Sequence, residues 1–333
     1  MTVDVRLEAL KAWLAGLNPE RKLKIEPASS DASFRRYFRV SGYSGNSLIA
    51  MDAPPEQEDT AAFRAVAERL RQAGVRVPTI LEADPAQGFL LLDDLGRETY
   101  LEAFSYRDPA PLMSAAVKAL VQMQRNTPAD GLPDFDRALL MRELNLFPEW
   151  YLGKELGIRP DPGLRRQLDI WFERLCERAL AQPRVFVHRD YMPRNLMASD
   201  PAPGIIDFQD AVRGPISYDP VCLFTDAFYS FPAATVEAGL RDYHHQARAA
   251  GLPLPDSVDT FLSDCRWMGA QRHLKVIGIF ARIAHRDGKR HYLPDIPRFF
   301  AYLRQAADAE PALAGLYELV GPWRPRSAMG ARA

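Results

Sequence analysis

Residues 187–195 read Val-His-Arg-Asp-Tyr-Met-Pro-Arg-Asn, and they fill the pattern H-R-D-x-x-x-x-N without a gap. This pattern is typical of a catalytic loop that transfers phosphoryl groups. Seventeen residues after Asp190 comes Asp207, which ends the short apolar run Ile205-Ile206. Phosphoryl-transfer enzymes place a second Mg²⁺ ligand at such a position. The two segments together predict one site, because a chance match to the loop pattern is rare.

Three side chains of these segments suit the chemistry of phosphoryl transfer. The reaction needs an acceptor for the proton of the attacking hydroxyl, and oxygen ligands for the Mg²⁺ that bridges the phosphates. We expect Asp190 to be the proton acceptor, and Asn195 and Asp207 to bind Mg²⁺. Taken singly, each aspartate could equally be a solvated loop carboxylate or a helix cap. We expect His188 and Arg189 to support the loop without reacting, with His188 orienting the backbone or Asp207.

Upstream of this loop, the first 95 residues are rich in strand signals. Apolar and β-branched runs, separated by turn-forming residues, predict five strands and two helices. The strands are expected at 23–26, 34–40, 47–51, 78–83 and 88–92, and the helices at 5–17 and 60–73.

From residue 96 onward the pattern changes to long amphipathic helices. They are expected at 109–126, 136–156, 162–181, 219–229, 234–250, 258–285 and 297–309, and two short strands at 185–211 flank the catalytic loop. The chain is therefore predicted to be an α+β protein of two lobes. Residues 1–95 form a small antiparallel five-stranded lobe that binds nucleotide. Residues 96–333 form a larger helical lobe that holds the catalytic loop and the acceptor site.

The nucleotide-binding segment lacks the usual glycine-rich loop, since no G-x-G-x-x-G is present. Small side chains at 28–33 (ASSDAS) would instead let backbone N–H groups approach the phosphates, and we assign Ser30 and Ser33 to this contact. A plain hairpin turn is the alternative. The run LLLDDLG at 90–96 is expected to form a hinge, where the backbone of Asp93 and Leu95 hydrogen bonds to adenine.

The phosphate-binding cation is the unusual feature of the small lobe. Of the 42 basic residues seven are lysine, and none lies between Lys24 and Lys118. The third strand therefore lacks the lysine that steadies the α- and β-phosphates in kinases. The candidates to replace it are Arg35, Arg36, Arg39 and Lys24. Arg35 and Arg36 are adjacent, so at most one of them points into the site, and we assign the role to Arg35.

The composition argues against several other classes of protein. With 42 basic and 43 acidic residues the net charge is −1, which does not suit a nucleic-acid-binding surface. Three scattered cysteines are too few for a disulfide framework or a cysteine-based zinc site. No apolar run approaches the roughly 18 residues of a transmembrane helix, and the first residues lack the apolar segment of a secretory signal. We therefore expect a cytoplasmic monomer without nucleic-acid or membrane partners.

Six blocks of sequence carry a family resemblance. They are DASFRRYFRV (31–40), LLLDDLG (90–96), MRELNLFPEWYLG (141–153), FVHRDYMPRNLM (186–197), GIIDFQDAVRGPISYDP (204–220) and RWMGAQRHLKVIGIF (266–280). On these blocks the chain resembles the aminoglycoside-phosphotransferase-like kinases, and within them the bacterial anomeric kinases of N-acetylmuramate and N-acetylglucosamine. The resemblance implies a protein-kinase-like fold and ATP- and Mg²⁺-dependent phosphorylation of the C1 hydroxyl. The products would be the α-1-phosphates of peptidoglycan recycling, on the route to UDP-N-acetylmuramate.

The sugar pocket is expected in the large lobe beside Asp190, walled by 141–151 and 263–285. The candidates for sugar contacts are Glu143, Asn145, Trp150, Arg194, Gln209 and Arg272. N-acetylmuramate carries a lactyl carboxylate, which Arg272 would bind, with His273 and Lys275 as alternatives. Gln209 stands where the D-F-G motif of protein kinases has glycine.

Two other functions remain open from the sequence. A related kinase for choline, an amino alcohol or an aminoglycoside would need an acidic or aromatic pocket for its cationic substrate. A kinase-like binding protein without activity would be consistent with the missing lysine. The intact Asp190, Asn195 and Asp207 argue against it, because a scaffold need not keep metal ligands.

Overall fold

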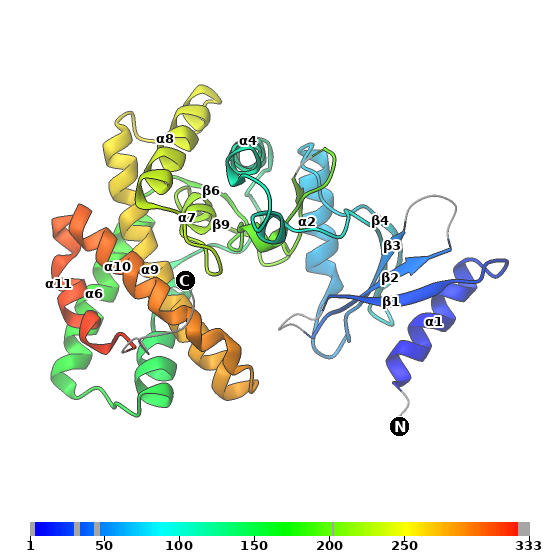
Figure 1. Ribbon diagram of the computed structural model, residues 1–333, viewed down its shortest axis with the longest axis horizontal. Coiled ribbons are helices and arrows are strands. Elements are labelled where there is room, and N and C mark those ends of the chain that lie inside the picture. Colours follow the sequence, from blue (N-terminus) through cyan, green and yellow to red (C-terminus); the bar gives the residue numbers. More distant parts are fainter. Residues whose placement is uncertain (1–3, 30–33, 43–46, 202, 326–333) are drawn as a thin grey trace.

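The structure, a computed structural model, describes residues 4–29, 34–42, 47–201 and 203–325. The smaller lobe holds one antiparallel sheet and two helices, namely α1 (Val5–Leu17), β1 (Lys24–Ser29), β2 (Arg36–Ser41), β3 (Leu48–Asp52), α2 (Thr60–Gln72), β4 (Ile80–Asp84) and β5 (Phe89–Asp93). The strand order is β1-β2-β3-β5-β4. Each of these elements lies where the sequence predicts one, and Figure 1 shows the sheet well separated from the helices of the larger lobe.

The sheet is covered on both faces, which explains the uninterrupted apolar run of β5. Successive residues of a strand point to opposite faces, and here each face meets a helix. Leu14 of α1 belongs to the same buried cluster as Leu91 of β5. On the other face, Phe63 of α2 shares a cluster with Met51 of β3 and Leu92 of β5. A strand buried on both faces needs apolar residues at every position.

The larger lobe is mostly helical. Its helices are α3 (Tyr100–Ala103), α4 (Pro109–Asn126), α5 (Arg137–Leu144), a π-helical segment (Phe147–Glu155), α6 (Pro162–Leu180), α7 (Tyr218–Phe224), α8 (Ala233–Ala249), α9 (Val258–Arg286), α10 (Ile296–Ala309) and α11 (Ala314–Val320). The central one is α9, which packs against α5, α6, α7, α8 and α10. The α+β, two-lobed architecture is therefore confirmed.

Two predicted helices differ from the structure. The helix expected at 136–156 is divided, because α5 ends at Leu144 and the π-helical segment begins next to Pro148, which has no backbone N–H to continue the bonding pattern. The helix expected at 219–229 ends at Phe224. Beyond it, the side chain of Asp226 accepts hydrogen bonds from the backbone N–H groups of Phe228 (2.6 Å) and Tyr229 (2.7 Å), which stabilises a loop instead.

Two small antiparallel strand pairs hold the catalytic loop. Strand β6 (Arg184–Val187) pairs with β9 (Val212–Pro215), and β7 (Leu196–Met197) pairs with β8 (Gly204–Ile205). The sequence predicts two strands in this region and the structure has four. The catalytic loop leaves β6 and enters β7, while Asp207 follows β8, so the two pairings bring both segments to one place.

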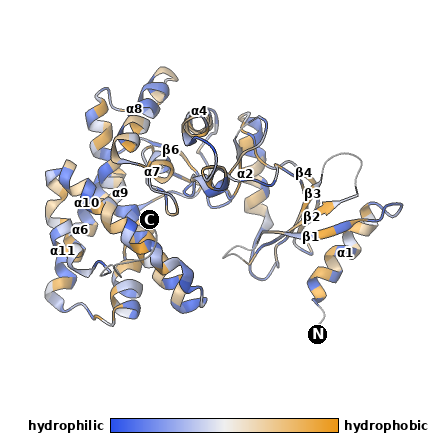
Figure 2. Cartoon of the chain, viewed as in Figure 1, coloured by the Kyte–Doolittle hydropathy of each residue, from blue (hydrophilic) through white to orange (hydrophobic). Residues whose placement is uncertain are grey.

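The helices of both lobes carry hydrophilic and hydrophobic sides, as Figure 2 shows. One large cluster of buried residues extends from α2 through the helical lobe. Among the residues that the structure describes, no helix combines the length and apolar character needed to cross a membrane.

Candidate active site

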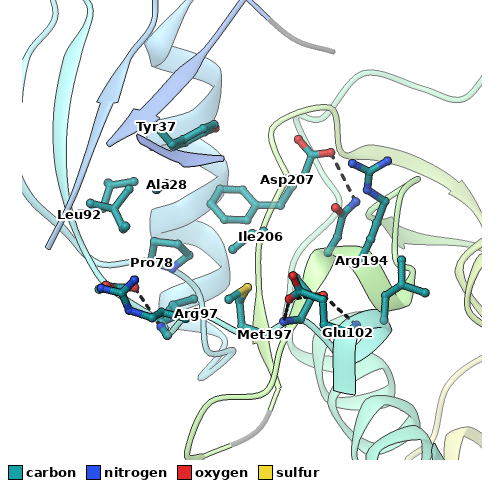
Figure 3. Close-up of a pocket in the computed structure, with 18 of the residues that line it drawn as sticks. Ala28, Tyr37, Pro78, Leu92, Arg97, Glu102, Arg194, Met197, Ile206 and Asp207 are labelled. Atoms are coloured by element: carbon teal, nitrogen blue, oxygen red, sulfur yellow. Dashed lines mark hydrogen bonds between the residues drawn. The ribbon is translucent and has the colours of Figure 1, made fainter. Parts of the chain in front are cut away.

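A cavity of about 580 Å³ lies between the two lobes and is lined by residues of both (Figure 3). At its apolar end, Ala28 and Leu92 of the sheet face Met197 and Ile206 of the larger lobe. Asp207 lies at its polar end. A flat apolar ring therefore fits between the two apolar walls, with space for charged groups beside Asp207.

The hinge after β5 is held by a buried ion pair. Asp94 accepts hydrogen bonds from Arg39 (2.6 and 3.1 Å) and from the hydroxyl of Ser47 (2.5 Å). Arg39 also donates to the carbonyl of Gly96 (2.8 Å). Burial opposes ionisation of Asp94, but the hydrogen bonds from Arg39 and Ser47 outweigh it and lower its pKa. The guanidinium of Arg39, a candidate phosphate cation, is therefore occupied by hydrogen bonds to Asp94 and Gly96 of the hinge.

The two residues expected to bind the base differ in whether their backbone groups are free to form a further hydrogen bond. The backbone N–H of Asp93 donates to the carbonyl of Thr79 (3.0 Å), and its carboxylate accepts from the N–H of Thr79 (2.5 Å). Leu95 lines the cavity, and its backbone has no hydrogen-bond partner within the described part of the chain. The geometry favours Leu95 over the N–H of Asp93 as the donor to a base.

The catalytic loop has a strained backbone that its surroundings stabilise. Arg189 (φ 76°) and Asp207 (φ 64°) are the two non-glycine residues of the described chain with positive φ. Such conformations are unfavourable and concentrate at functional sites. The buried carboxylate of Asp219 accepts hydrogen bonds from the backbone N–H of His188 (2.7 Å) and of Arg189 (3.0 Å). Burial raises the pKa of Asp219 to about 7.

His188 connects the loop to the Asp207 segment. Its burial lowers the pKa of the imidazole to about 4, so the ring is neutral near pH 7. Nδ1 accepts a hydrogen bond from the backbone N–H of Asp190 (3.3 Å), which leaves the proton on Nε2 to be donated to the carbonyl of Ile206 (3.1 Å). His188 therefore orients the residue before Asp207, as the sequence predicts, and is not placed as a base.

Asn195 and Asp207 lie together at the polar end of the cavity. The amide of Asn195 donates to the carbonyl of Asp190 (2.9 Å) and to Asp207 Oδ2 (3.4 Å), the latter drawn in Figure 3. A carboxylate and an amide oxygen are ligands that Mg²⁺ takes from a protein when phosphates and water complete its shell. No group of three or more His, Cys, Asp or Glu able to hold a metal occurs in the described ranges. The residues present thus fit a Mg²⁺ that arrives with a nucleotide.

Gln209 lies beside Asp207 and not in a separate sugar pocket. Its Nε2 donates to Asp207 Oδ1 (3.0 Å) and to Asp210 Oδ2 (3.2 Å), while its Oε1 is buried without a hydrogen-bond partner. The residue that replaces the glycine of D-F-G therefore orients Asp207, the predicted second metal ligand. This placement favours a positioning role over the sugar contact predicted for Gln209.

The candidate phosphate cations lie in different places. Arg35 contacts Asp207, a residue at the polar end of the cavity, with its Nη2 3.4 Å from Asp207 Oδ1. Arg36 pairs with the buried Asp52 (2.5 Å) on the α1 side of the sheet. Lys24 is exposed and pairs with a carboxylate of its own strand at 2.5 Å. The placement of Arg35 agrees with the role assigned to it from the sequence.

Glu143, predicted to contact the sugar, is buried behind the catalytic loop. Its carboxylate pairs with Arg189 and with Lys275 (3.2 Å), and it accepts a hydrogen bond from Gln271 (3.2 Å). Burial opposes ionisation of Glu143, but the charges of Lys275 and Arg189 outweigh it and lower its pKa. The network holds Arg189, which precedes Asp190, so the structure favours a supporting role for Glu143.

The remaining predicted sugar contacts are divided between the cavity and the protein interior. Arg194 lines the cavity, and its guanidinium lies 4.7 Å from the ring centre of Phe228. Arg272 is 2% exposed and donates to a backbone carbonyl at 3.0 Å. Asn145 is hydrogen bonded within the helical lobe, and Trp150 packs, partly buried, against its core.

The sequence does not predict several residues that line the cavity. They are Tyr37, Phe63, Pro78, Arg97, Met197, Phe228, His291 and Tyr292. They come from segments far apart in the chain, and each is an ordinary apolar or loop position. Met197 has the clearest signal, because it closely follows Asn195 of the catalytic loop. Ser30 and Ser33, assigned to the phosphate loop, lie outside the residues that the structure describes.

Comparison with known sequences identifies the family. The model of the phosphotransferase enzyme family matches residues 24–254. The chain is 50% identical, over 96% of its length and 97% of the relative's, to the N-acetylmuramate/N-acetylglucosamine kinase of Pseudomonas aeruginosa. It is 44% identical to the kinase of the same name from Neisseria meningitidis, over 94% of this chain and 95% of that one.

Solved structures share the fold at low identity. A choline kinase from Streptococcus pneumoniae matches with a TM-score of 0.64 and 12% identity, covering 91% of this chain and 99% of that chain. An ADP-bound aminoglycoside phosphotransferase matches with a TM-score of 0.60 and 13% identity, covering 92% and 99%. These likenesses concern the fold, which is the kinase-like fold expected from the sequence. Because the family model and relatives at 50% and 44% identity agree, this chain belongs to the phosphotransferase enzyme family.

Proposed function

We propose that the protein is an ATP-dependent sugar kinase that phosphorylates the anomeric C1 hydroxyl of N-acetylmuramate and N-acetylglucosamine to the α-1-phosphates. One observation carries the proposal. Asn195 and Asp207 line one cavity, and the amide of Asn195 also donates a hydrogen bond to the backbone carbonyl of Asp190, in a chain that is 50% identical to a kinase named for these two sugars. The sequence resemblance supplies the C1 position and the role in peptidoglycan recycling.

The nucleotide is proposed to occupy the apolar end of the cavity. Adenine would lie between Leu92 on one side and Met197 and Ile206 on the other, with a hydrogen bond from the backbone of Leu95. Asn195 would hold Mg²⁺ together with Asp207, and the metal would neutralise charge on the phosphates. We place the division between the nucleotide lobe and the catalytic lobe at residues 95 and 96, directly after the hinge strand.

Asp190 is proposed to act on the attacking hydroxyl. An anomeric hydroxyl is more acidic than a simple alcohol, so we expect Asp190 to contribute by positioning it at least as much as by removing its proton. The backbone of Asp190 is held by the side chains of Asn195 and His188. These contacts support a fixed geometry for the reacting carboxylate.

The acceptor is proposed to bind where the cavity wall is formed by Arg194, Phe228 and Tyr292. Arg194 is the cation of this wall and matches the lactyl carboxylate of N-acetylmuramate. Arg272 and Lys275, the alternatives from the sequence, are 2% and 6% exposed and lie among helices of the larger lobe. Arg194 would repel choline and aminoglycosides, which are positively charged, whereas the nearby carboxylate of Asp295 is paired with Arg298 at 3.1 Å.

Mg·ATP assays with N-acetylmuramate, N-acetylglucosamine, choline and kanamycin test the proposal. We expect turnover with the two sugars, and a phosphorus NMR signal coupled to the C1 proton of the product. Turnover confined to choline or kanamycin would replace the proposed substrate class. The absence of turnover with all four compounds, in protein that binds ATP, would favour the inactive binding protein.

Replacing Arg35 with alanine tests the proposed phosphate cation. We expect kcat/KM for ATP to fall by about tenfold to a hundredfold, because hydrogen bonds to charged groups contribute about 1.5–3 kcal/mol. Arg35→Lys should restore part of this loss, since it keeps the charge. Steady-state kinetics at saturating sugar measure the effect.

The neighbouring Arg36→Ala variant is the matched control. It removes the same charge one position along the strand, on the face that pairs with Asp52. Asp52 keeps a second partner in Arg6 at 2.5 Å, so the fold should persist. Equal losses of kcat/KM in the two variants would contradict the assignment of Arg35.

A further inference from the structure

A second cavity of about 140 Å³ lies among α7, α8, α9 and α10. Its lining is mostly apolar, and its charged or long polar members are Glu237, Arg266 and Gln305. The other lining residues are Val221, Thr225, Ala233, Val236, Leu240, Leu262, Cys265, Gly269, His273, Tyr302, Ala306 and Ala309. Glu237 and Gln305 are exposed, so the cavity opens to the surface. An apolar cavity of this size can hold a benzene molecule.

The cavity contains a buried imidazole that lacks hydrogen bonds. His273 is 2% exposed, and its ring centre lies 5.1 Å from that of Tyr302 and 5.9 Å from that of Phe299. Within the described chain its Nδ1 is buried without a hydrogen-bond partner, whereas Nε2 is not fully buried. Burial, together with the neighbouring charge of Arg272, lowers the pKa of His273 well below its ordinary value. The neutral ring offers one donor and one acceptor.

Gly269 keeps the space in front of this imidazole open. It lies in the interior of α9, where glycine is less favourable than alanine. A Cβ atom at this position would lie 3.2 Å from His273 Nε2 and 3.7 Å from Cγ1 of Val221. The absence of a side chain thus exposes Nε2 to the cavity at a cost in helix stability.

We propose that this cavity is a second binding site, for a small apolar molecule of about benzene size that carries one hydroxyl group bonded to His273. Carbon atoms dominate the lining, and an ordered water needs two to four polar partners, so the cavity suits an apolar body better than water. The hydroxyl pairs with Nε2, the ring nitrogen that faces the space in front of Gly269, and gives the imidazole a hydrogen-bond partner that the protein does not supply. The ligand packs on Val221 of α7, the helix whose Asp219 holds the catalytic loop.

Calorimetric titration of the full chain with phenol and with toluene tests this site. The two probes have the same size and differ by a hydroxyl in place of a methyl group. Excess ADP is present throughout to occupy the nucleotide cleft. We expect saturable binding of phenol, with a Kd about fivefold lower than that of toluene, the contribution of one hydrogen bond.

Two variants locate the binding. Gly269→Ala narrows the space in front of Nε2 and should weaken the binding of phenol by about tenfold or more. The melting temperature should not fall, because alanine is more favourable than glycine inside a helix. His273→Phe keeps an aromatic ring but removes both ring nitrogens, so the variant should bind both probes with similar Kd. The proposal is overturned if phenol shows no saturable binding, if Gly269→Ala binds phenol as the unmodified chain does, or if His273→Phe retains the preference for phenol.

Discussion

Replacement of Asp190 by alanine is expected to lower kcat by about 10²- to 10⁴-fold, the range that a positioned acid–base group contributes. The affinity for ADP should remain nearly unchanged, because the base lies at the hinge and the phosphates at Asn195 and Asp207. The reason for the loss is geometric as well as chemical. Without the carboxylate, the attacking hydroxyl has neither its proton acceptor nor its orienting partner. Single-turnover kinetics and ADP titration measure the two quantities separately.

Asp308→Asn serves as the control for this variant. Asp308 is an exposed carboxylate of α10, paired with Arg304 at 3.7 Å, and it does not line the cleft. Its loss should leave kcat close to that of the unmodified enzyme. If Asp190→Ala retained most of its kcat, Asp190 would not be the catalytic acceptor and the proposed mechanism would fail.

Replacement of Asp207 by alanine should lower kcat by about a thousandfold or more. The metal contributes several kcal/mol of charge stabilisation in the transition state, and each 1.4 kcal/mol is about tenfold in rate. The variant should also lose the Mg²⁺ dependence of ADP binding, since it lacks the carboxylate that we propose as metal ligand. Titration of ADP with and without Mg²⁺ measures this directly and does not depend on turnover.

Asp210→Asn is the matched control for Asp207. Asp210 is exposed, lies three residues away and shares the same hydrogen-bond donor, Gln209, at 3.2 Å. Its substitution should preserve the Mg²⁺ dependence. If the two variants lost it equally, the metal would not be held at Asp207 in the manner proposed.

Much of the fold can be predicted from the sequence because its signals are local. The five strands of the small lobe are short apolar runs bounded by turn-forming residues, and each begins within two residues of its predicted position. The helix expected at 136–156 is divided beside Pro148, a helix-breaking signal that the sequence itself contains, whereas the early end of the helix expected at 219–229 could not be predicted. The second depends on the side chain of Asp226, whose backbone contacts compete with further helical turns.

The same contrast between local sequence signals and tertiary contacts applies to the residues of the candidate active site. Asp190, Asn195 and Asp207 could be predicted because they lie beside two small antiparallel strand pairs within one segment of the chain. The roles of polar residues in the longer blocks of family resemblance could not be predicted from spacing. Glu143 and Arg272 looked like sugar contacts, yet burial places Glu143 against Arg189 and Lys275 and leaves Arg272 in the interior.

The sequence by itself determined that the small lobe has no lysine from residue 25 to 117, and it predicted the catalytic loop and the second metal ligand. Only the tertiary structure distinguishes the arginines that could replace the missing lysine as the phosphate-binding cation. Of the arginines near the phosphate loop, Arg39 is bound to Asp94 and Arg36 to Asp52, whereas Arg35 reaches Asp207. Motif spacing is a local property of the chain, but the direction of a side chain depends on which distant segments pack beside it.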